Sequence, residues 1–199
     1  MQEPLEGIKV LEMTVAVQGP SAGLYLRDMG AEVVKLEPPL GDGSRYVRAQ
    51  QNNTPDGTVA PQYVAANRGK RSICLDISTK TGRKAVHALL KDADVFLTNY
   101  RLPALKKMGL DYESLKAQHP LLIHASVNGF GPEGPDADKA MLDGVAASRG
   151  GLVHQTGYAD RESCLPGAII IDTAGAMQLA LGTMTAIVAR ERHGVGQQV

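Results

Sequence analysis

The sequence has no tryptophan and only two phenylalanines among its 199 residues. Its core must therefore be built from aliphatic side chains, and a hydrophobic content of 43% is sufficient for a soluble globular domain. Only two cysteines occur, Cys74 and Cys164, which excludes a disulfide framework and a four-cysteine zinc site. This sparse use of cysteine is typical of a reducing compartment, so we expect a cytoplasmic location.

An excess of either charge is also lacking, because 21 Lys and Arg residues balance 21 Asp and Glu residues. A general nucleic-acid-binding protein needs a basic surplus to neutralise phosphates, so we expect no nucleic-acid partner. The start of the chain is acidic and lacks the apolar stretch of a signal peptide. No apolar run approaches the roughly 20 residues of a membrane span, so we expect no membrane partner.

Common catalytic motifs are missing as well. The five histidines are scattered and form neither HxxH nor HExxH, so we expect no metal site. His124 lies inside an apolar run and is expected to be a core residue. The sequence contains no GxxxxGK[ST] phosphate loop and no GxSxG nucleophile elbow, which argues against nucleotide phosphoryl transfer and against an α/β-hydrolase.

What the sequence does contain is a regular alternation of strand and helix patterns. Strands are expected at 7–14, 31–37, 70–77, 94–98 and 120–127, and helices at 22–29, 62–67, 81–91, 105–108, 112–118, 139–149 and 172–192. This order predicts an α/β fold with a Rossmann-like, doubly wound, mostly parallel sheet. The length suits one domain, residues 1–199.

A dinucleotide site is the first alternative that such a fold raises. Glu37 closes the second strand, where a dinucleotide-binding fold places its ribose-binding acid. The preceding loop, residues 18–23, is not a GxGxxG fingerprint, and Pro20 removes a backbone N–H that a pyrophosphate would need. The sequence therefore disfavours an NAD site, and the simpler interpretation of Glu37 is a solvated strand end.

Polar groups at the carboxyl ends of the strands are better candidates for a ligand site. Asn99, Tyr100 and Arg101 follow the fourth strand, and carboxyl ends of parallel strands carry the ligand sites of such sheets. Turn chemistry is an equally good explanation of these residues. The cluster of basic residues at 68, 70 and 71 is either a solvated turn or a set of phosphate partners.

Asp172 follows three isoleucines and precedes a helix rich in small residues. It could act as the N-cap of that helix, where the helix dipole would favour its ionised form. It could instead be a carboxylate nucleophile presented at the start of a helix. The local sequence leaves both interpretations open.

Six motifs, in order along the chain, resemble the family III CoA-transferases, the CaiB/BaiF group that includes formyl-CoA transferase. They are Leu5-Glu-Gly-Ile-Lys-Val-Leu-Glu12, Gly30-Ala-Glu-Val-Val-Lys-Leu-Glu-Pro-Pro39, Gly41-Asp-Gly-Ser-Arg45, Asn67-Arg-Gly-Lys-Arg-Ser-Ile-Cys-Leu-Asp76, Asn128-Gly-Phe-Gly-Pro-Glu-Gly-Pro135 and Gly194-Val-Gly-Gln-Gln-Val199. The resemblance covers all 199 residues. It implies the N-terminal CoA-binding and catalytic portion of the large domain of such an enzyme.

The resemblance implies transfer of CoA from an acyl-CoA donor to a carboxylic acid, with Asp172 as the catalytic nucleophile. That residue would pass through an acyl anhydride and an aspartyl-CoA thioester, intermediates that need fixed positions and shielding from water. The CoA contacts would fall on Val17, Gln18, Leu75, Asn99, Tyr100, Arg101, Lys107, Met108, Lys139, Ala140 and Asp143. Lys107 and Lys139 would then meet phosphates, and Met108 would pack on adenine.

Three departures from the family pattern qualify this implication. Pro38 stands where formyl-CoA transferase has an arginine, which leaves Arg45 or Arg71 to supply that phosphate contact. Leu142 stands where the related acyl-CoA racemases carry a histidine, which favours a transferase over the alternative racemase or epimerase.

The third departure is length, because family members carry a second half with a small domain, a glycine-rich loop and a returning C-terminal segment, and form interlocked homodimers. We therefore expect this chain to need a C-terminal half or a complementing chain, and to have little activity alone. A non-catalytic CoA-binding subunit remains the alternative from another functional class.

Overall fold

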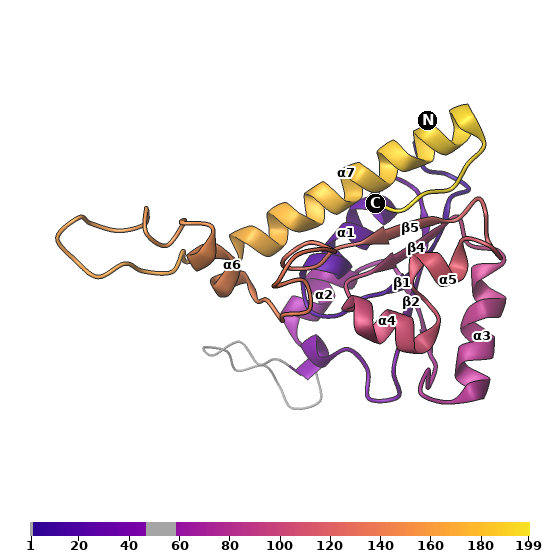
Figure 1. Cartoon of the computed structure of the whole chain (residues 1–199), viewed down its shortest axis with the longest axis horizontal. Helices are drawn as coiled ribbons and strands as arrows, with labels where there is room; N and C mark the ends of the chain where they lie inside the picture. Colours follow the sequence, from indigo (N-terminus) through magenta and orange to yellow (C-terminus); the bar gives the residue numbers. More distant parts are fainter. Residues whose placement is uncertain (1, 47–58) are drawn as a thin grey trace.

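The computed structural model describes residues 2–46 and 59–199. Within these residues five parallel strands form one sheet in the order β3-β2-β1-β4-β5 (Figure 1). The strands are β1 (Lys9–Met13), β2 (Glu32–Glu37), β3 (Arg71–Cys74), β4 (Val95–Thr98) and β5 (Ile123–Ser126). The α/β fold and the parallel sheet are thus confirmed.

Helices cover both faces of the sheet, as the doubly wound prediction requires. They are α1 (Gln18–Asp28), α2 (Pro61–Asn67), α3 (Lys80–Leu90), α4 (Leu102–Met108), α5 (Tyr112–Leu115), α6 (Asp143–Arg149) and α7 (Ile170–His193), with a 3₁₀ helix η1 (Gly43–Tyr46). One core joins α1 and α7 to the sheet, and a second core joins α3, α4 and α5 to the opposite face. The strand order reverses between β1 and β4, which is where ligands bind in folds of this type.

Four helix starts differ from the sequence predictions by two to four residues: those of α1 and α7, that of α4, at Leu102 rather than 105, and that of α6, at Asp143 rather than 139. Helix α1 begins at Gln18 rather than at 22, because Pro20 lies in its first turn, where the missing N–H has no helical partner to lose. Helix α7 begins at Ile170, so Asp172 lies inside its first turn and Ile169 is the N-cap, without a side-chain cap bond. The interpretation of Asp172 as the N-cap is therefore wrong.

The last residues of the chain run beside β5. The His124 N–H donates to the Gln197 carbonyl at 2.9 Å, and the Ser126 N–H donates to the Val199 carbonyl at 2.9 Å. This pairing is parallel and continues the sheet past β5. His124 is 1% exposed and meets the rings of Phe96 and Tyr112 edge-on, which confirms it as a core residue.

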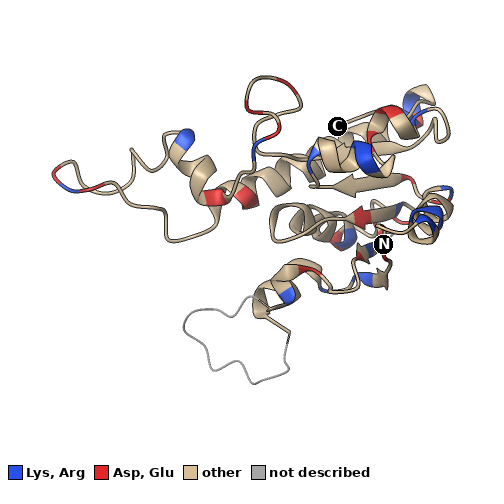
Figure 2. Ribbon diagram, turned by 60° about the horizontal axis from the view of Figure 1, so that its bottom comes forward, with Lys and Arg blue, Asp and Glu red and all other residues tan. Residues whose placement is uncertain are grey.

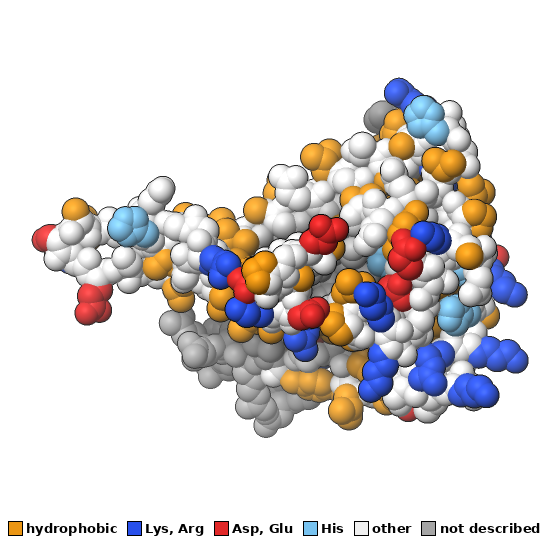
Figure 3. Space-filling model, viewed as in Figure 1, with side chains coloured by type: hydrophobic (Ala, Val, Ile, Leu, Met, Phe, Trp, Pro, Cys, Tyr) orange, Lys and Arg blue, Asp and Glu red, His pale blue; other side chains and the backbone are white. Residues whose placement is uncertain are grey.

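Helix α7 is 24 residues long and contains an 18-residue stretch with a mean hydropathy of 1.2, so by length and composition it could cross a membrane. The expectation that no run approaches a membrane span was therefore wrong. The helix nevertheless lies across α1 (Figure 1), and Ala176, Leu179 and Ala180 on that face are buried in the core. A helix packed in the core of a soluble protein can have the same length and hydropathy, so these two properties do not identify a membrane span. Between α6 and α7 the chain makes a long loop that extends away from the body of the molecule (Figure 3).

Candidate active site

The loops that follow β1 and β4 are joined at the point where the strand order reverses. The Asn99 Nδ2 donates to the Val15 carbonyl at 2.8 Å, and the Val15 N–H donates to Asn99 Oδ1 at 2.9 Å. Gly19 lets the loops approach, since a Cβ there would lie 2.7 Å from the Thr14 side chain and 3.0 Å from that of Asn99. Asn99 therefore fixes the β1–α1 loop beside β4.

Gln18 connects this loop to the start of α7. A Cβ on Gly175 would lie only 2.2 Å from Gln18 Nε2, so the glutamine side chain fills the space that the glycine leaves. Gly175 is one helical turn from Asp172. The structure thus brings Gln18 and Asp172, two residues singled out from the sequence, to the same end of α7.

Asp143 caps helix α7 from the neighbouring helix α6. Its Oδ1 accepts hydrogen bonds from the backbone N–H of Ile171 at 2.8 Å and of Asp172 at 3.0 Å. Figure 2 shows acidic positions side by side where α6 and α7 begin. The carboxylate satisfies two N–H groups that a helix start leaves free, and it lies at the positive end of the helix dipole.

The Asp172 side chain is half-buried in this setting. Burial raises the pKa of Asp172 above its ordinary value of 3.8, and the negative charge of Asp143 raises it further. A higher pKa makes the ionised carboxylate a stronger base and a better nucleophile, and it also means that the group takes up a proton at less acidic pH.

Other predicted site residues follow β3 and β4 at the carboxyl-terminal edge of the sheet or lie in α4. Leu75, Tyr100 and Met108 are partly buried against the core on the α3 face. The Arg101 guanidinium donates to the Asp138 carbonyl at 3.3 Å, which joins the β4–α4 loop to the loop before α6.

The remaining predicted contacts are more exposed. Lys139 pairs with Asp136 at 2.6 Å but keeps 64% of its side chain exposed. Lys107 and Ala140 are exposed, and Val17 is half-buried next to Gln18. The structure thus leaves the cations Arg101, Lys107 and Lys139 accessible to an anionic ligand.

The basic residues before β3 already pair with carboxylates of the protein, so they are less available to an anionic ligand. Arg68 donates to Asp28 at 2.8 Å, and Arg71 pairs with Glu32 at 3.1 Å at the amino-terminal edge of the sheet. The Lys70 side chain is only 2% exposed. The solvated-turn interpretation is therefore wrong for Lys70, and the structure gives the phosphate interpretation no support.

Glu37 is another correction, because it is 3% exposed rather than a solvated strand end. It accepts from Arg45 Nε at 2.7 Å and from Ser72 Oγ at 2.7 Å. Burial alone would raise the pKa of Glu37, but the hydrogen bonds from Arg45 and Ser72 outweigh it and hold the pKa well below its usual range. Arg45 is thus committed to Glu37, which makes it a poor replacement for the arginine absent at Pro38.

One contributor to the site escaped the sequence analysis. Asp42 Oδ1 accepts a hydrogen bond from the Ala16 N–H at 3.3 Å, and Ala16 has a φ of +65°, in the left-handed region. The signal was present in the Gly41-Asp-Gly-Ser segment, where an Asp followed two residues later by Ser is typical of a side-chain-closed turn.

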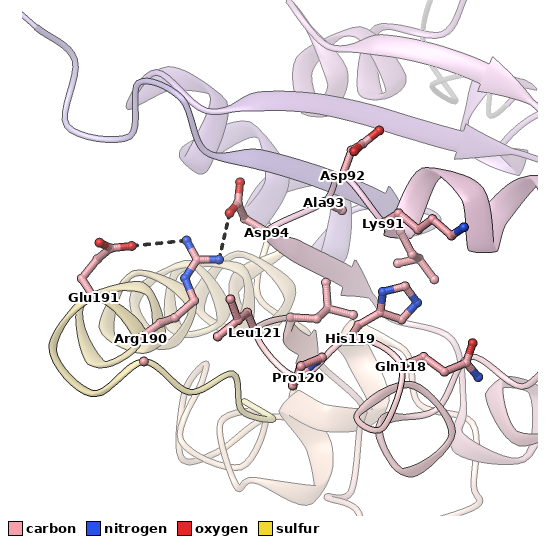
Figure 4. A pocket seen from close by; sticks show the side chains of 13 residues that line it. Lys91, Asp92, Ala93, Asp94, Gln118, His119, Pro120, Leu121, Arg190 and Glu191 are labelled. Carbon is pink, nitrogen blue, oxygen red and sulfur yellow. Dashed lines mark hydrogen bonds and ion pairs between the residues drawn. The ribbon is translucent and has the colours of Figure 1, made fainter.

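A pocket of about 580 Å³ lies at the opposite edge of the sheet, at the amino-terminal ends of β4 and β5 (Figure 4). Figure 4 shows Arg190 between Asp94 and Glu191, at 2.9 Å and 3.5 Å from their carboxylates. Lys91 and His119 also line the pocket, and its charged side chains are of both signs. Because Asp172 is at the carboxyl-terminal edge, this pocket is separate from the site described above.

Comparison with known proteins matches the sequence of this chain to one protein family. Residues 5–199 match the family described as CoA-transferase family III. The chain is 38% identical to succinate–glutarate CoA-transferase of Agrobacterium fabrum, covering 98% of this chain and 50% of that protein. It is 36% identical to formyl-CoA:oxalate CoA-transferase of Streptomyces avermitilis, covering 100% of this chain and 47% of that protein.

Solved structures give the same result. A CaiB/BaiF family protein from Brucella suis superposes with a TM-score of 0.94 at 39% identity, covering 100% of this chain and 53% of that one. The protein Rv3272 from Mycobacterium tuberculosis superposes with a TM-score of 0.91 at 32% identity, covering 99% of this chain and 55% of that one. The chain spans about half the length of the curated relatives it matches.

Proposed function

Since this chain belongs to CoA-transferase family III, we propose that it is the N-terminal CoA-binding and catalytic portion of an enzyme that transfers CoA from an acyl-CoA donor to a carboxylic acid. The observation that supports this most strongly is the setting of Asp172. It is a half-buried carboxylate in the first turn of α7, with Asp143 holding the backbone beside it and Gln18 packed one turn further along. A carboxylate that forms covalent acyl intermediates needs such a fixed and partly shielded position.

In the first half-reaction, a carboxylate oxygen of Asp172 attacks the thioester carbonyl of the donor. The C–S bond breaks, and the products are a mixed anhydride on Asp172 and a CoA thiolate. The thiolate then attacks the carbonyl carbon of Asp172, the anhydride C–O bond breaks, and the donor leaves as a free carboxylate. Asp172 now carries CoA as a thioester.

In the second half-reaction, the acceptor carboxylate attacks the aspartyl thioester and displaces the CoA thiolate, forming a second anhydride. The thiolate attacks the acyl carbon of the acceptor, which yields the new acyl-CoA and restores the Asp172 carboxylate. No proton has to be moved at any carbon. This is consistent with Leu142, which is 76% exposed, in the place of a racemase histidine.

CoA itself would be held by the loops at the carboxyl-terminal edge. We assign phosphate contacts to the exposed Arg101, Lys107 and Lys139, since such cations form strong charge-assisted bonds to phosphate oxygens. Met108 would pack on the adenine ring. The remaining contacts are assigned to Val17, Gln18, Leu75, Asn99, Tyr100, Ala140 and Asp143.

The complete enzyme requires more than these residues. We propose that a C-terminal half, with a small domain, completes the fold as part of an interlocked homodimer or as a complementing chain, and that the enzyme works in the cytoplasm. We expect the 199-residue chain alone to show little or no transfer activity, because half of the relatives' length is missing. Assaying it before and after addition of the other half tests this, and full activity of the isolated chain would contradict it.

The function is tested by incubating the complete enzyme with an acyl-CoA and a panel of carboxylic acids. We expect one new acyl-CoA for each donor acid released, with no loss of total thioester. Deuterium appearing at the α-carbon without exchange of acids would instead indicate the racemase. CoA binding without any turnover, even with the other half present, would indicate a non-catalytic subunit.

Replacing Asp143 should separate its charge from its capping role. Asp143→Asn keeps an oxygen for the N–H groups of α7 but removes the negative charge that raises the pKa of Asp172. Because Asp172 attacks only when ionised, activity falls as the pH drops through its pKa. We therefore expect the acid limb of kcat/KM to move to lower pH in this variant.

Asp143→Ala removes the hydrogen-bond acceptor as well as the charge. We expect the acid limb to move as in Asp143→Asn and the activity above that limb to fall by roughly tenfold, because the first turn of α7 loses the partner that fixes it. Rate profiles of the two variants between pH 4 and 8 give the measurement, with pH values chosen around the ordinary range of carboxyl groups. Identical profiles for Asp143→Asn and the unmodified enzyme would show that Asp143 does not tune Asp172.

A further inference from the structure

Four charged side chains are buried together beneath the β1–α1 loop. They are Glu12, Lys35, Asp42 and Lys70, here called the buried tetrad, and none is more than 2% exposed. Glu12 and Lys35 occupy central parallel strands, where both faces are normally apolar. The tetrad carries two positive and two negative charges, so it is neutral as a unit.

The tetrad joins segments that are far apart in the sequence. Lys35 Nζ lies 3.3 Å from Glu12 Oε1 and 3.0 Å from Asp42 Oδ2, and it donates to the Thr14 carbonyl at 2.9 Å. Lys70 Nζ lies 2.8 Å from Glu12 Oε2 and donates to the Pro20 carbonyl at 2.7 Å. The two lysines therefore hold backbone carbonyls on both sides of the β1–α1 loop.

Asp42 reaches the middle of the same loop. Its Oδ1 accepts from the Ala16 N–H at 3.3 Å and from the Ser44 N–H at 2.9 Å, while its Oδ2 faces Lys35. Ala16 adopts a φ of +65°, which places its Cβ too close to the following carbonyl oxygen and is disfavoured for alanine. The loop keeps this conformation because its surroundings impose it.

We propose that the buried tetrad positions the β1–α1 loop, with Asp42 holding Ala16 in the left-handed conformation that directs Val17 and Gln18 toward the start of α7. Asp42 is thus a positioning residue that acts through Ala16. The assignment of this loop to CoA and to the reaction rests on the function proposed above. The positioning role of the tetrad is argued from its own contacts with the loop and does not depend on that function.

Stability alone is a weak explanation of the tetrad. Removing four charges from water is costly, and buried ion pairs can often be replaced by apolar side chains without loss of stability. Such groups are retained in some proteins because they specify one conformation. Here the specified conformation is that of a loop that contacts the nucleophile's helix through Gln18 and Gly175.

The test uses the complete enzyme with Asp42→Ala, alone and combined with Ala16→Gly. We expect the single variant to increase amide hydrogen exchange at residues 15–18 and to weaken acyl-CoA binding, each by about tenfold. Adding Ala16→Gly should recover roughly fivefold of the lost binding, since glycine adopts the left-handed conformation without penalty. A role limited to overall stability would not be rescued at this one position.

Ala16→Val provides a second variant that leaves the buried charges untouched. A β-branched residue is still less tolerant of a positive φ, so we expect it to reproduce the faster exchange and the weaker binding in a folded protein. Asp76→Ala is the matched control. Asp76 closes the same kind of turn, accepting from the Ser78 N–H at 3.0 Å and Oγ at 2.6 Å, but it is exposed and neither hydrogen bond involves Ala16.

The outcomes separate this inference from the proposed function. Unchanged exchange at residues 15–18 in both Asp42→Ala and Ala16→Val would overturn the positioning role, whatever the enzyme does. Faster exchange that Ala16→Gly does not affect would overturn the part assigned to Ala16. If the unmodified enzyme neither binds nor transfers CoA, the proposed function fails, while the exchange measurement still tests the tetrad.

Discussion

Asp172→Asn is expected to lower the rate of CoA transfer in the complete enzyme by roughly a thousandfold or more, the scale of loss when a covalent nucleophile is removed. An amide in the same place is a far poorer nucleophile and cannot form the anhydride. The fold should be retained, because the contact that fixes this residue is its backbone N–H on Asp143, which the substitution leaves in place. Initial rates and the unfolding midpoint of the variant give the two measurements.

Glu191→Gln is a suitable control for that experiment. Glu191 lies on the same helix at its other end, where it pairs with Arg190 at 3.5 Å and is 70% exposed, so we expect nearly unchanged transfer. If Asp172→Asn kept more than about a tenth of the original rate, the loss would be too small for a covalent nucleophile, and Asp172 would have to be regarded as a binding residue.

Gly23→Ala is expected to destabilise the protein by about 3 kcal/mol or more, although alanine is normally the better helix former. A Cβ at Gly23 would lie 1.8 Å from Glu12 Oε2, well inside contact distance. Glu12 is completely buried and pairs with Lys70 through that same oxygen. The methyl group would push the carboxylate away from its partner and leave charges buried without compensation. Chemical denaturation of the complete protein measures the effect.

Gly144→Ala is the matched helical control. Gly144 lies in α6, and a Cβ there would meet Leu165 Cδ2 at 3.4 Å, which is ordinary contact. Its free energy of unfolding should change by less than about 1 kcal/mol, in the stabilising direction if anything. A similar small change for Gly23→Ala would show that Glu12 can move without penalty and that the buried tetrad is not rigid.

The strands and most helices could be predicted from the sequence because their patterns are local. The apolar runs that became β4 and β5 needed no knowledge of the rest of the chain, and Gly30 marked the end of α1 correctly, with a φ of +105°. The start of α1 was placed at 22, four residues too late, although a proline is tolerated in a first helical turn, which is where Pro20 lies.

The buried charges could not be predicted in the same way. Glu12 and Lys35 are separated by 23 residues in sequence and meet only because β1 and β2 are parallel neighbours. Read singly, a charge at a strand end suggests exposure, and this is why Glu37 was taken for a solvated residue. Its hydrogen-bond partners Arg45 and Ser72 lie 8 and 35 residues further along the chain. Pairing of this kind is decided by tertiary structure.

In the site, too, single residues could be predicted from the sequence but their contacts could not. Asp172 and Gln18 could be singled out from the sequence, but their meeting depends on Gly175, whose role is visible only when the glutamine fills the space beside it. Asp143 was expected among the CoA contacts. The structure shows it capping α7 from another helix, a long-range contact that no sequence pattern records.

The most direct test of the account is the chemical state of Asp172 during turnover. The complete enzyme is incubated with an acyl-CoA and hydroxylamine, which captures activated carboxyl groups, and its peptides are analysed by mass spectrometry. We expect a hydroxamate on the peptide containing Asp172, dependent on acyl-CoA and absent in Asp172→Asn. An unmodified Asp172 peptide in an enzyme that is actively transferring CoA would contradict it.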